Sequence, residues 1–325
     1  MVLGAGGKPM TFDANPSDPD ADLMAAADDI VAAFQIDGEP VRGRIVRLGP
    51  ATVDEILQRH NYPDCVAKLL GEMLTLAALV GASLKFDGKL IIQVQGENGL
   101  EGPIRFIVAE YRTNGALRGY ANVDGVALAK LLATKPEPTL PELIGPGLFA
   151  MTVDQGDDMD RYQGTVALEG DTLAEAAALY FAQSEQIPTR IRIACAETQG
   201  PTGRSQWRAG GALIQQVAGD SARGDTAMAW EHASILFETL EDRELINAEL
   251  SAGDLLYRLF HEDGVRLFEA KPIETACTCS SDRILALLKQ FGAEAAAEMI
   301  EADGFIRVRC EYCNKSFDVR PEELL

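Results

Sequence analysis

The sequence has little positive charge and little histidine for its length. Of its 325 residues, 29 are lysine or arginine and 50 are aspartate or glutamate, which gives a formal net charge of -21. Proteins bind duplex DNA or RNA through lysine and arginine side chains that release counterions from the phosphates, so this balance excludes nucleic acid as an expected partner. The three histidines, His60, His232 and His261, are isolated from one another in the sequence, which favours surface or capping roles.

Long apolar runs and export signals are also missing. The most apolar stretch, residues 69–84, is about 16 residues long and includes Gly71 and Glu72, so it predicts a buried helix and not a membrane span. Residues 1–12 lack the charged and apolar regions of a signal peptide. We therefore expect a cytoplasmic protein with no membrane partner. In that reducing compartment, paired cysteines are more often metal ligands than structural disulfides.

The first 28 residues are rich in glycine, proline and aspartate. A segment of this composition cannot bury enough apolar area to offset the entropy lost on ordering. We therefore predict a disordered acidic tail over residues 1–28, followed by a folded core.

Residues 29–220 contain strong turn signals and short strand-like runs. Asp87-Gly88 and Asn114-Gly115 predict hairpin turns. The predicted strands cover residues 90–95, 104–108, 117–120, 149–153, 164–168 and 189–193, and the predicted helices cover residues 63–84 and 172–184. Because strands and helices do not alternate regularly, the fold class is α+β, with a mainly antiparallel-sheet core and packed helices.

Residues 221–276 carry twelve acidic and five basic side chains. Apolar residues recur among them at near-helical spacing: Trp230, Ile235, Leu236, Phe237, Leu240, Leu255, Leu256, Leu259 and Phe260. The segment is too apolar for a plain spacer and too acidic for a well-buried core. We interpret residues 221–271 as a metastable linker of amphipathic helices that rest on a neighbour. The pattern is equally compatible with ordinary surface helices of the core.

Four of the six cysteines lie within the last fifty residues, as the pairs Cys277-Thr278-Cys279 and Cys310-Glu311-Tyr312-Cys313. Two thiolate pairs brought together make a tetrahedral four-sulfur site, which structural zinc prefers. We predict one Zn²⁺ per chain in the reduced state, bound within a small domain of residues 272–325. This domain is expected to contain two short helices, at 282–291 and 293–303, and a knuckle hairpin around the second pair. With so small an apolar core, metal should contribute on the order of 10 kcal/mol to its folding.

Other functions fit the cysteine spacing. A permanently folded zinc ribbon that acts as an adaptor for a folded partner protein is the commoner interpretation of such spacing. A thiol oxidoreductase acting through Cys310 and Cys313 is less favoured, because the expected strand-helix-strand context is missing. The remaining cysteines, Cys65 and Cys195, are interpreted as inert buried thiols.

The sequence around the two cysteine pairs resembles the zinc-binding C-terminus of the 33 kDa chaperonin family, the redox-regulated heat-shock holdases. The resemblance extends from about residue 30 to the end of the chain. Matching core segments are Leu69-Leu70-Gly71-Glu72, Gln93-Val94-Gln95-Gly96, Arg118-Gly119-Tyr120-Ala121, Gln183-Ser184-Glu185-Gln186-Ile187-Pro188-Thr189 and Ala209-Gly210-Gly211.

This resemblance implies a chaperone of the stress response without enzymatic turnover. In the reduced, zinc-loaded state it would be an inactive monomer. Oxidants would join Cys277 to Cys279 and Cys310 to Cys313, and zinc would be released. The zinc domain and the linker would then unfold, and the exposed surface would hold unfolding client proteins without ATP, often as a homodimer. The core, residues 29–220, would be the platform for these clients.

The chemistry of these residues supports the same order of events. Zinc keeps sulfur as thiolate at neutral pH, the form that hypochlorite or peroxide attacks. A sulfenic acid on one sulfur has a partner thiolate within reach and can close a disulfide, which removes two ligands at once. The linker would then lose its docking partner and expose the client-binding candidates, which are Trp230, Phe237, Leu256 and Phe260.

Overall fold

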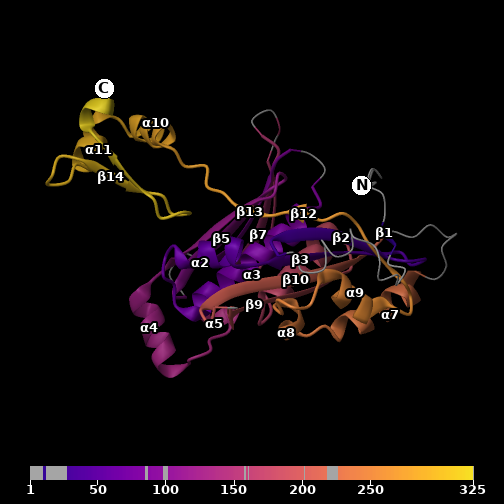
Figure 1. Cartoon of the computed structure of the whole chain (residues 1–325). Coiled ribbons are helices and arrows are strands. Elements are labelled where there is room, and N and C mark those ends of the chain that lie inside the picture. The colour runs from indigo at the N-terminus through magenta and orange to yellow at the C-terminus, as the bar shows by residue number, and fades with distance from the viewer. Residues whose placement is uncertain are drawn as a thin grey trace.

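The structure is a computed structural model. It describes residues 10–11, 28–84, 87–97, 102–156, 159, 161–200, 202–217 and 226–324. These form two sheets around a central helix, a helical segment on one sheet, and a small C-terminal module that projects from the body (Figure 1). The module contacts the body at its cysteine turn. The predicted tail lies outside the described residues except for Met10–Thr11 and Asp28, and so does the start of the predicted linker, 221–225.

One sheet contains seven strands, and all its pairings are antiparallel. Its order is β1-β11-β2-β3-β10-β9, and β12 also pairs with β2. The strands are β1 (Met10–Thr11), β2 (Ile30–Ile36), β3 (Val41–Leu48), β9 (Thr189–Gln199), β10 (Ser205–Gln216), β11 (Val265–Leu267) and β12 (Lys271–Pro272). β11 places Leu267 opposite Phe34, and β12 places Lys271 opposite Val31. The end of the predicted linker is therefore hydrogen-bonded into the core sheet.

The second sheet contains six strands in the order β13-β6-β5-β4-β7-β8. They are β4 (Lys89–Gly96), β5 (Ile104–Arg112), β6 (Ala116–Val123), β7 (Gly147–Asp154), β8 (Tyr162–Ala167) and β13 (Glu274–Thr275). The pairing of β13 with β6 is parallel, and the other pairings are antiparallel. The α+β fold class with mainly antiparallel sheets is confirmed.

The two predicted hairpin turns differ in outcome. Asn114-Gly115 joins β5 to β6 as predicted, and Gly115 has the positive φ of 95° that glycine adopts readily. Asp87-Gly88 instead precedes β4 in the connection that leads from a helix, so the hairpin predicted there is wrong. An Asp-Gly pair marks a reversal of the chain, but it does not determine whether a strand or a helix comes before it.

Helix α3 (Asp64–Gly81) lies between the two sheets. It packs against β4, β5 and β6 on one side and against β3, β9 and β10 on the other. Leu70, Met73 and Leu76 along it are fully buried. Because sheets cover both faces, most of the helix is apolar and buried, which confirms the predicted buried helix. Its first turns also carry Asp64 and Lys68, which are exposed. Among the described residues, no helix is long and apolar enough to cross a membrane.

Shorter helices connect the strands of the core. They are η1 (Pro50–Asp54), α2 (Glu55–Gln58), α4 (Gly125–Thr134), α5 (Leu140–Ile144), α6 (Leu173–Tyr180) and η3 (Phe181–Glu185). The predicted helix at 172–184 is thus α6 continued by the π-helix η3. Its N-cap is Thr172, whose hydroxyl accepts a hydrogen bond from the Glu175 amide.

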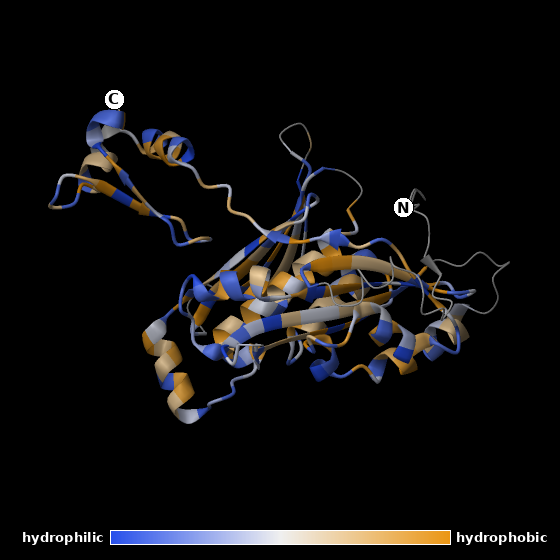
Figure 2. Cartoon of the chain, in the orientation of Figure 1, coloured by the Kyte–Doolittle hydropathy of each residue, from blue (hydrophilic) through white to orange (hydrophobic). Residues whose placement is uncertain are grey.

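Three helices of the acidic segment pack on the outer face of the seven-stranded sheet. They are α7 (Thr226–Glu238), α8 (Asp242–Leu245) and α9 (Ala252–Phe260). Phe237, Leu256 and Phe260 are 3%, 1% and 0% exposed, and they join strand residues in a second hydrophobic cluster. Apolar and polar residues alternate along these helices (Figure 2). The predicted amphipathic helices that rest on a neighbour are therefore confirmed, because the acidic side chains lie on the solvent side and the apolar side chains pack on the sheet. The metastability of the segment stays a prediction.

The C-terminal module consists of α10 (Ser281–Phe291), α11 (Ala293–Glu298), the β14 (Ile306–Arg309) and β15 (Ser316–Val319) hairpin, and the 3-10 helix η5 (Pro321–Leu324). The predicted knuckle hairpin and first helix are confirmed. The second helix ends at Glu298 and is shorter than predicted. The chain enters this module directly from β13, which is held in the six-stranded sheet.

Candidate metal centre

Four cysteine sulfurs converge where the C-terminal module meets its connecting chain. The sulfurs of Cys277 and Cys310 are 3.6 Å apart, and those of Cys279 and Cys313 are 3.4 Å apart. All four lie within 4.8 Å of one another, in a group that can hold a metal ion. The structure thus brings together the four residues that the sequence predicts as ligands.

The second cysteine pair is held by a tight turn between β14 and β15. The Cys310 amide donates to the Lys315 carbonyl at 2.9 Å, and the Asn314 amide donates to the Cys310 carbonyl at 2.8 Å. Asn314 has a left-handed backbone with φ of 59°, a conformation that asparagine adopts more readily than most residues. This turn directs both sulfurs toward the first pair.

The first cysteine pair lies between β13 and the N-terminus of α10. Ser280 is the N-cap of α10, and its hydroxyl accepts a hydrogen bond from the Arg283 amide at 3.3 Å. The Arg283 guanidinium reaches back to the Thr278 carbonyl at 2.9 Å and fixes the loop between the two sulfurs. The cap and the guanidinium together fix the first pair at the N-terminus of α10.

The environment of the sulfurs separates their pKa values. Burial by itself would raise the pKa of Cys277. Hydrogen bonds from the Cys279 amide and from the neighbouring thiols outweigh this and lower the pKa of Cys277 to about 7. Burial raises the pKa of Cys279 and Cys310, whose thiols keep their protons and donate them. The cluster therefore readily loses a first proton, from Cys277. Loss of a proton is needed before a sulfur can bind a metal cation, because the thiolate is the ligand.

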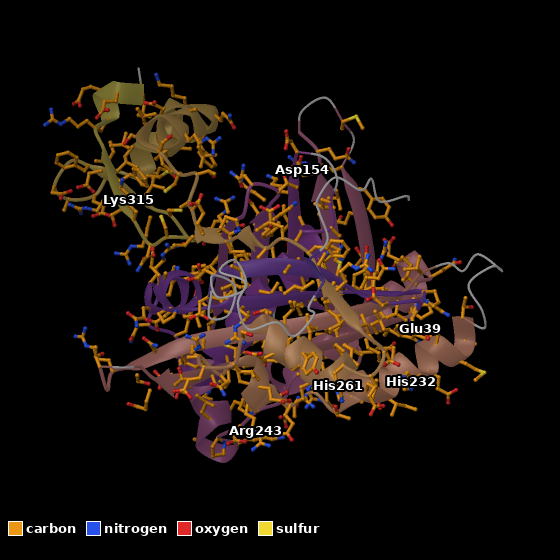
Figure 3. The ribbon with its side chains drawn as sticks, turned by 45° about the vertical axis from the view of Figure 1, so that its right-hand side comes forward. Glu39, Asp154, His232, Arg243, His261 and Lys315 are labelled. Carbon is orange, nitrogen blue, oxygen red and sulfur yellow. The ribbon has the colours of Figure 1, made fainter. Side chains whose placement is uncertain are left out.

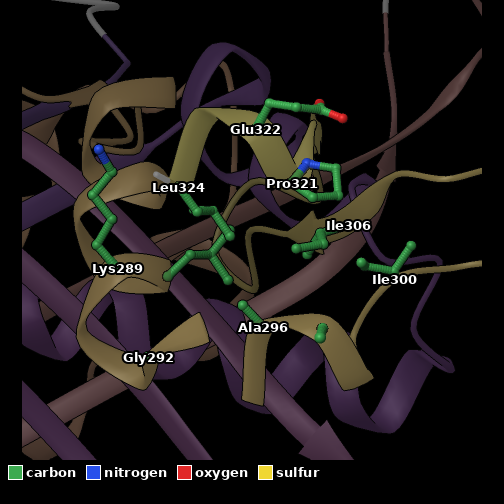
Figure 4. Close-up of a pocket in the computed structure, with 10 residues that line it drawn as sticks. Lys289, Gly292, Ala296, Ile300, Ile306, Pro321, Glu322 and Leu324 are labelled. Carbon is green, nitrogen blue, oxygen red and sulfur yellow. The ribbon is translucent and has the colours of Figure 1, made fainter. Parts of the chain in front are cut away.

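The module around this group has a small and incompletely filled core. Its core cluster consists of Leu288, Ala296, Ile306 and Val319, and Phe317 of β15 is also buried. Beside them lies a hollow of about 330 Å³ between α10, α11, β14 and η5, lined among others by Ile300, Pro321 and Leu324 (Figure 4). Large apolar side chains remain at the surface, since Phe291 is 55% and Leu287 is 46% exposed. So few buried side chains contribute little folding free energy, and a bound metal ion would supply more.

Several core residues contact the cysteine region although the sequence analysis assigns them no role. Arg118 on β6 donates to the Thr278 hydroxyl at 3.0 Å and lies over the Tyr312 ring. His60 lies against the same turn, and burial lowers its pKa. The resemblance included Arg118-Gly119-Tyr120-Ala121 as a segment, but no local pattern reveals that β6 faces the cysteine turn.

The predicted client-binding residues lie away from the cysteines. Trp230 and Phe237 are on α7, and Leu256 and Phe260 are on α9. Trp230 is partly buried, and the Arg190 guanidinium lies 5.8 Å from its ring centroid. The other three are buried against the seven-stranded sheet. In this state, none of the four presents an open apolar surface.

The other histidines and cysteines do not join the metal centre. Figure 3 shows His232 and His261 on the helical segment, far from the module that carries Lys315. His232 pairs with Asp263 at 3.1 Å. Cys195 is buried as predicted and burial raises its pKa, whereas Cys65 is only partly buried.

Comparisons with known proteins agree with this arrangement. The model of the Hsp33 protein family matches residues 29–320. A 33 kDa chaperonin of Caulobacter vibrioides is 52% identical over 303 residues, covering 93% of this chain and 97% of the relative. One of Serratia proteamaculans is 37% identical over 277 residues, covering 85% and 87%. The crystal structure of the 33 kDa chaperonin from Thermotoga maritima superposes with a TM-score of 0.75 at 25% identity, covering 91% of this chain and 96% of that one.

Proposed function

The chain belongs to the Hsp33 family of 33 kDa chaperonins, and from this premise we propose that it is an ATP-independent holdase activated by oxidation. The family is one of chaperones and not of enzymes. Our proposal adds that the four cysteines sense the oxidant, that zinc holds the C-terminal third closed, and that unfolding proteins are the clients. The convergence of four sulfurs in a module with so small a core carries this proposal.

Zinc fits the donor set. A tetrahedral ion with zinc–sulfur distances of about 2.3 Å requires sulfurs about 3.8 Å apart. The two short separations are 3.4 and 3.6 Å, and all four sulfurs lie within 4.8 Å of one another. The short pairs would move slightly apart and the wider ones closer together, by at most about 1 Å, to reach this value. Four thiolates without oxygen ligands also disfavour magnesium and calcium. Cys277, Cys279, Cys310 and Cys313 would hold the ion, which would keep all four as thiolates at neutral pH.

Oxidation would act on the sulfurs themselves. Peroxide or hypochlorite takes two electrons from a sulfur and forms a sulfenic acid, and the neighbouring thiolate displaces water or hydroxide to form the disulfide. We propose the pairs Cys277–Cys279 and Cys310–Cys313, so two oxidant molecules are consumed per chain. Each disulfide removes two donors, so the module loses the interaction that compensates for its small core.

The opened module would release the linker. β12 and β13 connect the cysteine arm to the two core sheets through pairings of two residues each, which are too short to persist alone. Once this connection is lost, α7 and α9 can leave the seven-stranded sheet and expose Trp230, Phe237, Leu256 and Phe260. A net charge of -21 would keep the opened protein from aggregating with itself. We propose that the active form works in the cytoplasm, often as a homodimer.

A client-aggregation assay tests this proposal. The protein, reduced or treated with hypochlorite, is added to a heat-unfolding client, and light scattering and free zinc are recorded. The proposal predicts suppression only after oxidation, with one zinc ion released per chain. Equal or weaker suppression after oxidation would instead indicate a zinc-ribbon adaptor. Turnover of a small disulfide substrate that does not require Cys277 or Cys279 would indicate an oxidoreductase.

A further inference from the structure

We propose that the core carries a docking surface for the closed cysteine turn, made by Arg118 and Tyr120 of β6 and by residues 59–62. Docking on this surface and metal binding then strengthen each other. The inference rests on the proposed function, because it identifies the core residues that contact the four-cysteine site in its reduced, metal-binding conformation. It assigns a role to core residues that lie outside the metal-ligand set.

Tyr312 is the centre of the contact on the module side. It lies between Cys310 and Cys313, so its position depends on the turn that those two cysteines close. Its ring meets the Tyr120 ring edge-on, with centroids 4.8 Å apart and planes at 70°. The Arg118 guanidinium carbon lies 4.0 Å from the Tyr312 centroid, within the range of a cation–π interaction.

Arg118 contacts both cysteine arms, the first being residues 277–279 and the second residues 310–313. Besides Tyr312 of the second arm, it bonds to the hydroxyl of Thr278, which lies between the cysteines of the first arm, at 3.0 Å. The opposite side of its guanidinium pairs with Glu110 at 2.7 Å, and the two side chains are 13% and 2% exposed. The buried carboxylate of Glu110 fixes the orientation of Arg118. Because the guanidinium does not move, it contacts Thr278 and Tyr312 together only when the two cysteine pairs lie side by side.

A second contact depends on the backbone of the cysteine turn. The Asn314 side-chain amide donates to the Arg59 carbonyl at 2.6 Å, and Asn314 reaches that position from its left-handed conformation at the end of the turn. The Arg59 guanidinium also donates to the Thr275 hydroxyl of β13 at 2.7 Å. Residues of the core thus hold the turn and the strand that leads to the cysteines.

These contacts connect metal binding to the pairing of β13 with β6. β13 pairs with β6 through two residues, reinforced by hydrogen bonds from the Glu274 amide to Gly115 at 3.0 Å and from the Ala276 amide to Leu117 at 3.3 Å. So short a pairing depends on neighbouring contacts for its persistence. If the metal orders the turn that docks, docking must by thermodynamic reciprocity raise the affinity for the metal.

A double-mutant cycle on the full-length reduced protein tests the proposal. Zinc affinity is measured by competition with a chromophoric chelator for the wild type, Tyr120→Ala, Tyr312→Ala and the double variant. Neither tyrosine is charged or a ligand, so loss of affinity cannot come from a changed charge at the sulfurs. We expect each single substitution to weaken zinc binding roughly five- to tenfold, and the double variant to be scarcely weaker than the single ones. Tyr162→Ala is the matched control, since Tyr162 is 52% exposed on β8 at the opposite edge of the same sheet.

Amide hydrogen exchange gives a readout independent of affinity. In zinc-saturated Tyr120→Ala, the amides of Glu274 and Ala276 should exchange at least fivefold faster than in the wild type and in Tyr162→Ala. A zinc affinity of Tyr120→Ala within twofold of the wild type, or fully additive effects in the double variant, would overturn the proposal. Neither measurement uses an oxidant or a client, so a failed chaperone assay leaves this result interpretable, and a failed cycle leaves the proposed function standing.

Discussion

Phe260 of α9 packs against Phe34 of β2, with ring centroids 6.1 Å apart and planes tilted by 32°. Both side chains are at most 1% exposed. One of the expected client-binding residues therefore belongs to the hydrophobic cluster between the helical segment, α7 to α9, and the seven-stranded sheet. Under the proposed function, Phe260 must leave Phe34 before it can contact a client, so the strength of this packing would set how easily the helical segment opens.

Removing the Phe260 ring should loosen the helical segment in the reduced protein. The Phe260→Ala substitution should lower the free energy of opening of this segment by about 3 kcal/mol, because it leaves a cavity in a closely packed cluster. Hydrogen exchange of the α9 amides measures this effect. Ile235→Ala is the control, since Ile235 is 58% exposed on α7. Equal protection of α9 in both variants would show that the cluster does not close the segment.

Gly43 leaves room for the Phe34 ring on the neighbouring strand. A Cβ atom at position 43 would lie 2.0 Å from the end of that ring, so Gly43→Ala must displace Phe34 from Phe260. We expect a loss of about 2 kcal/mol in stability and activation at a lower dose of oxidant. A titration with hypochlorite, read by client aggregation, measures the shift. Gly125→Ala should leave the dose unchanged, since a Cβ there meets nothing within 4 Å.

The ligand assignment predicts unequal effects of two conservative cysteine substitutions. Cys310→Ser should bind zinc poorly and melt the C-terminal module at a lower temperature, because a serine hydroxyl is not ionised at neutral pH and is a poor zinc ligand. Cys65→Ser, which changes a cysteine outside the cluster, should retain one zinc ion per chain. Metal analysis and thermal unfolding of the reduced proteins measure both effects. Full metal content in Cys310→Ser would refute the assignment.

Glu72 on α3 should make the core less stable as the pH rises. Burial raises its pKa to about 7, with Lys68 opposing this and Asp242 adding to it. The unfolded chain loses this proton near pH 4.5, so the free energy of unfolding falls between pH 4.5 and 7 and then levels off. Glu72→Gln should therefore stabilise the protein by about 2 kcal/mol at pH 8 and by much less at pH 5. Urea unfolding at both pH values checks this, and a gain that does not change with pH would contradict it.

The sequence predicts the parts of this fold that depend on local patterns. The apolar run at 69–84 identifies α3, the Asn114-Gly115 pair identifies a hairpin, and the cysteine spacing identifies the metal centre. Periodicity and turn conformation act between neighbouring residues. The two cysteine pairs are about thirty residues apart, but each is a recognisable ligand pair by its local spacing.

Contacts between distant segments are not predictable in this way. The β11 and β12 strands are only three and two residues long, and their place beside β2 depends on where the whole chain has folded. The same holds for Arg118, which resembles an ordinary strand residue in the sequence. In the structure, the chain after β13 places Thr278 beside it, and the turn between β14 and β15 places Tyr312 beside it. The spacing of the acidic segment likewise predicts amphipathic helices, but it does not show which strands of the core they cover.

The most direct test of the account is hydrogen exchange of the reduced protein before and after zinc is removed with a strong chelator, without any oxidant. We predict that stripping the metal greatly accelerates exchange in residues 272–324 and in α7 and α9, while α3 and the strands that flank it stay protected. If α7 and α9 remained as protected without zinc as with it, the metal could not be what keeps the C-terminal third closed.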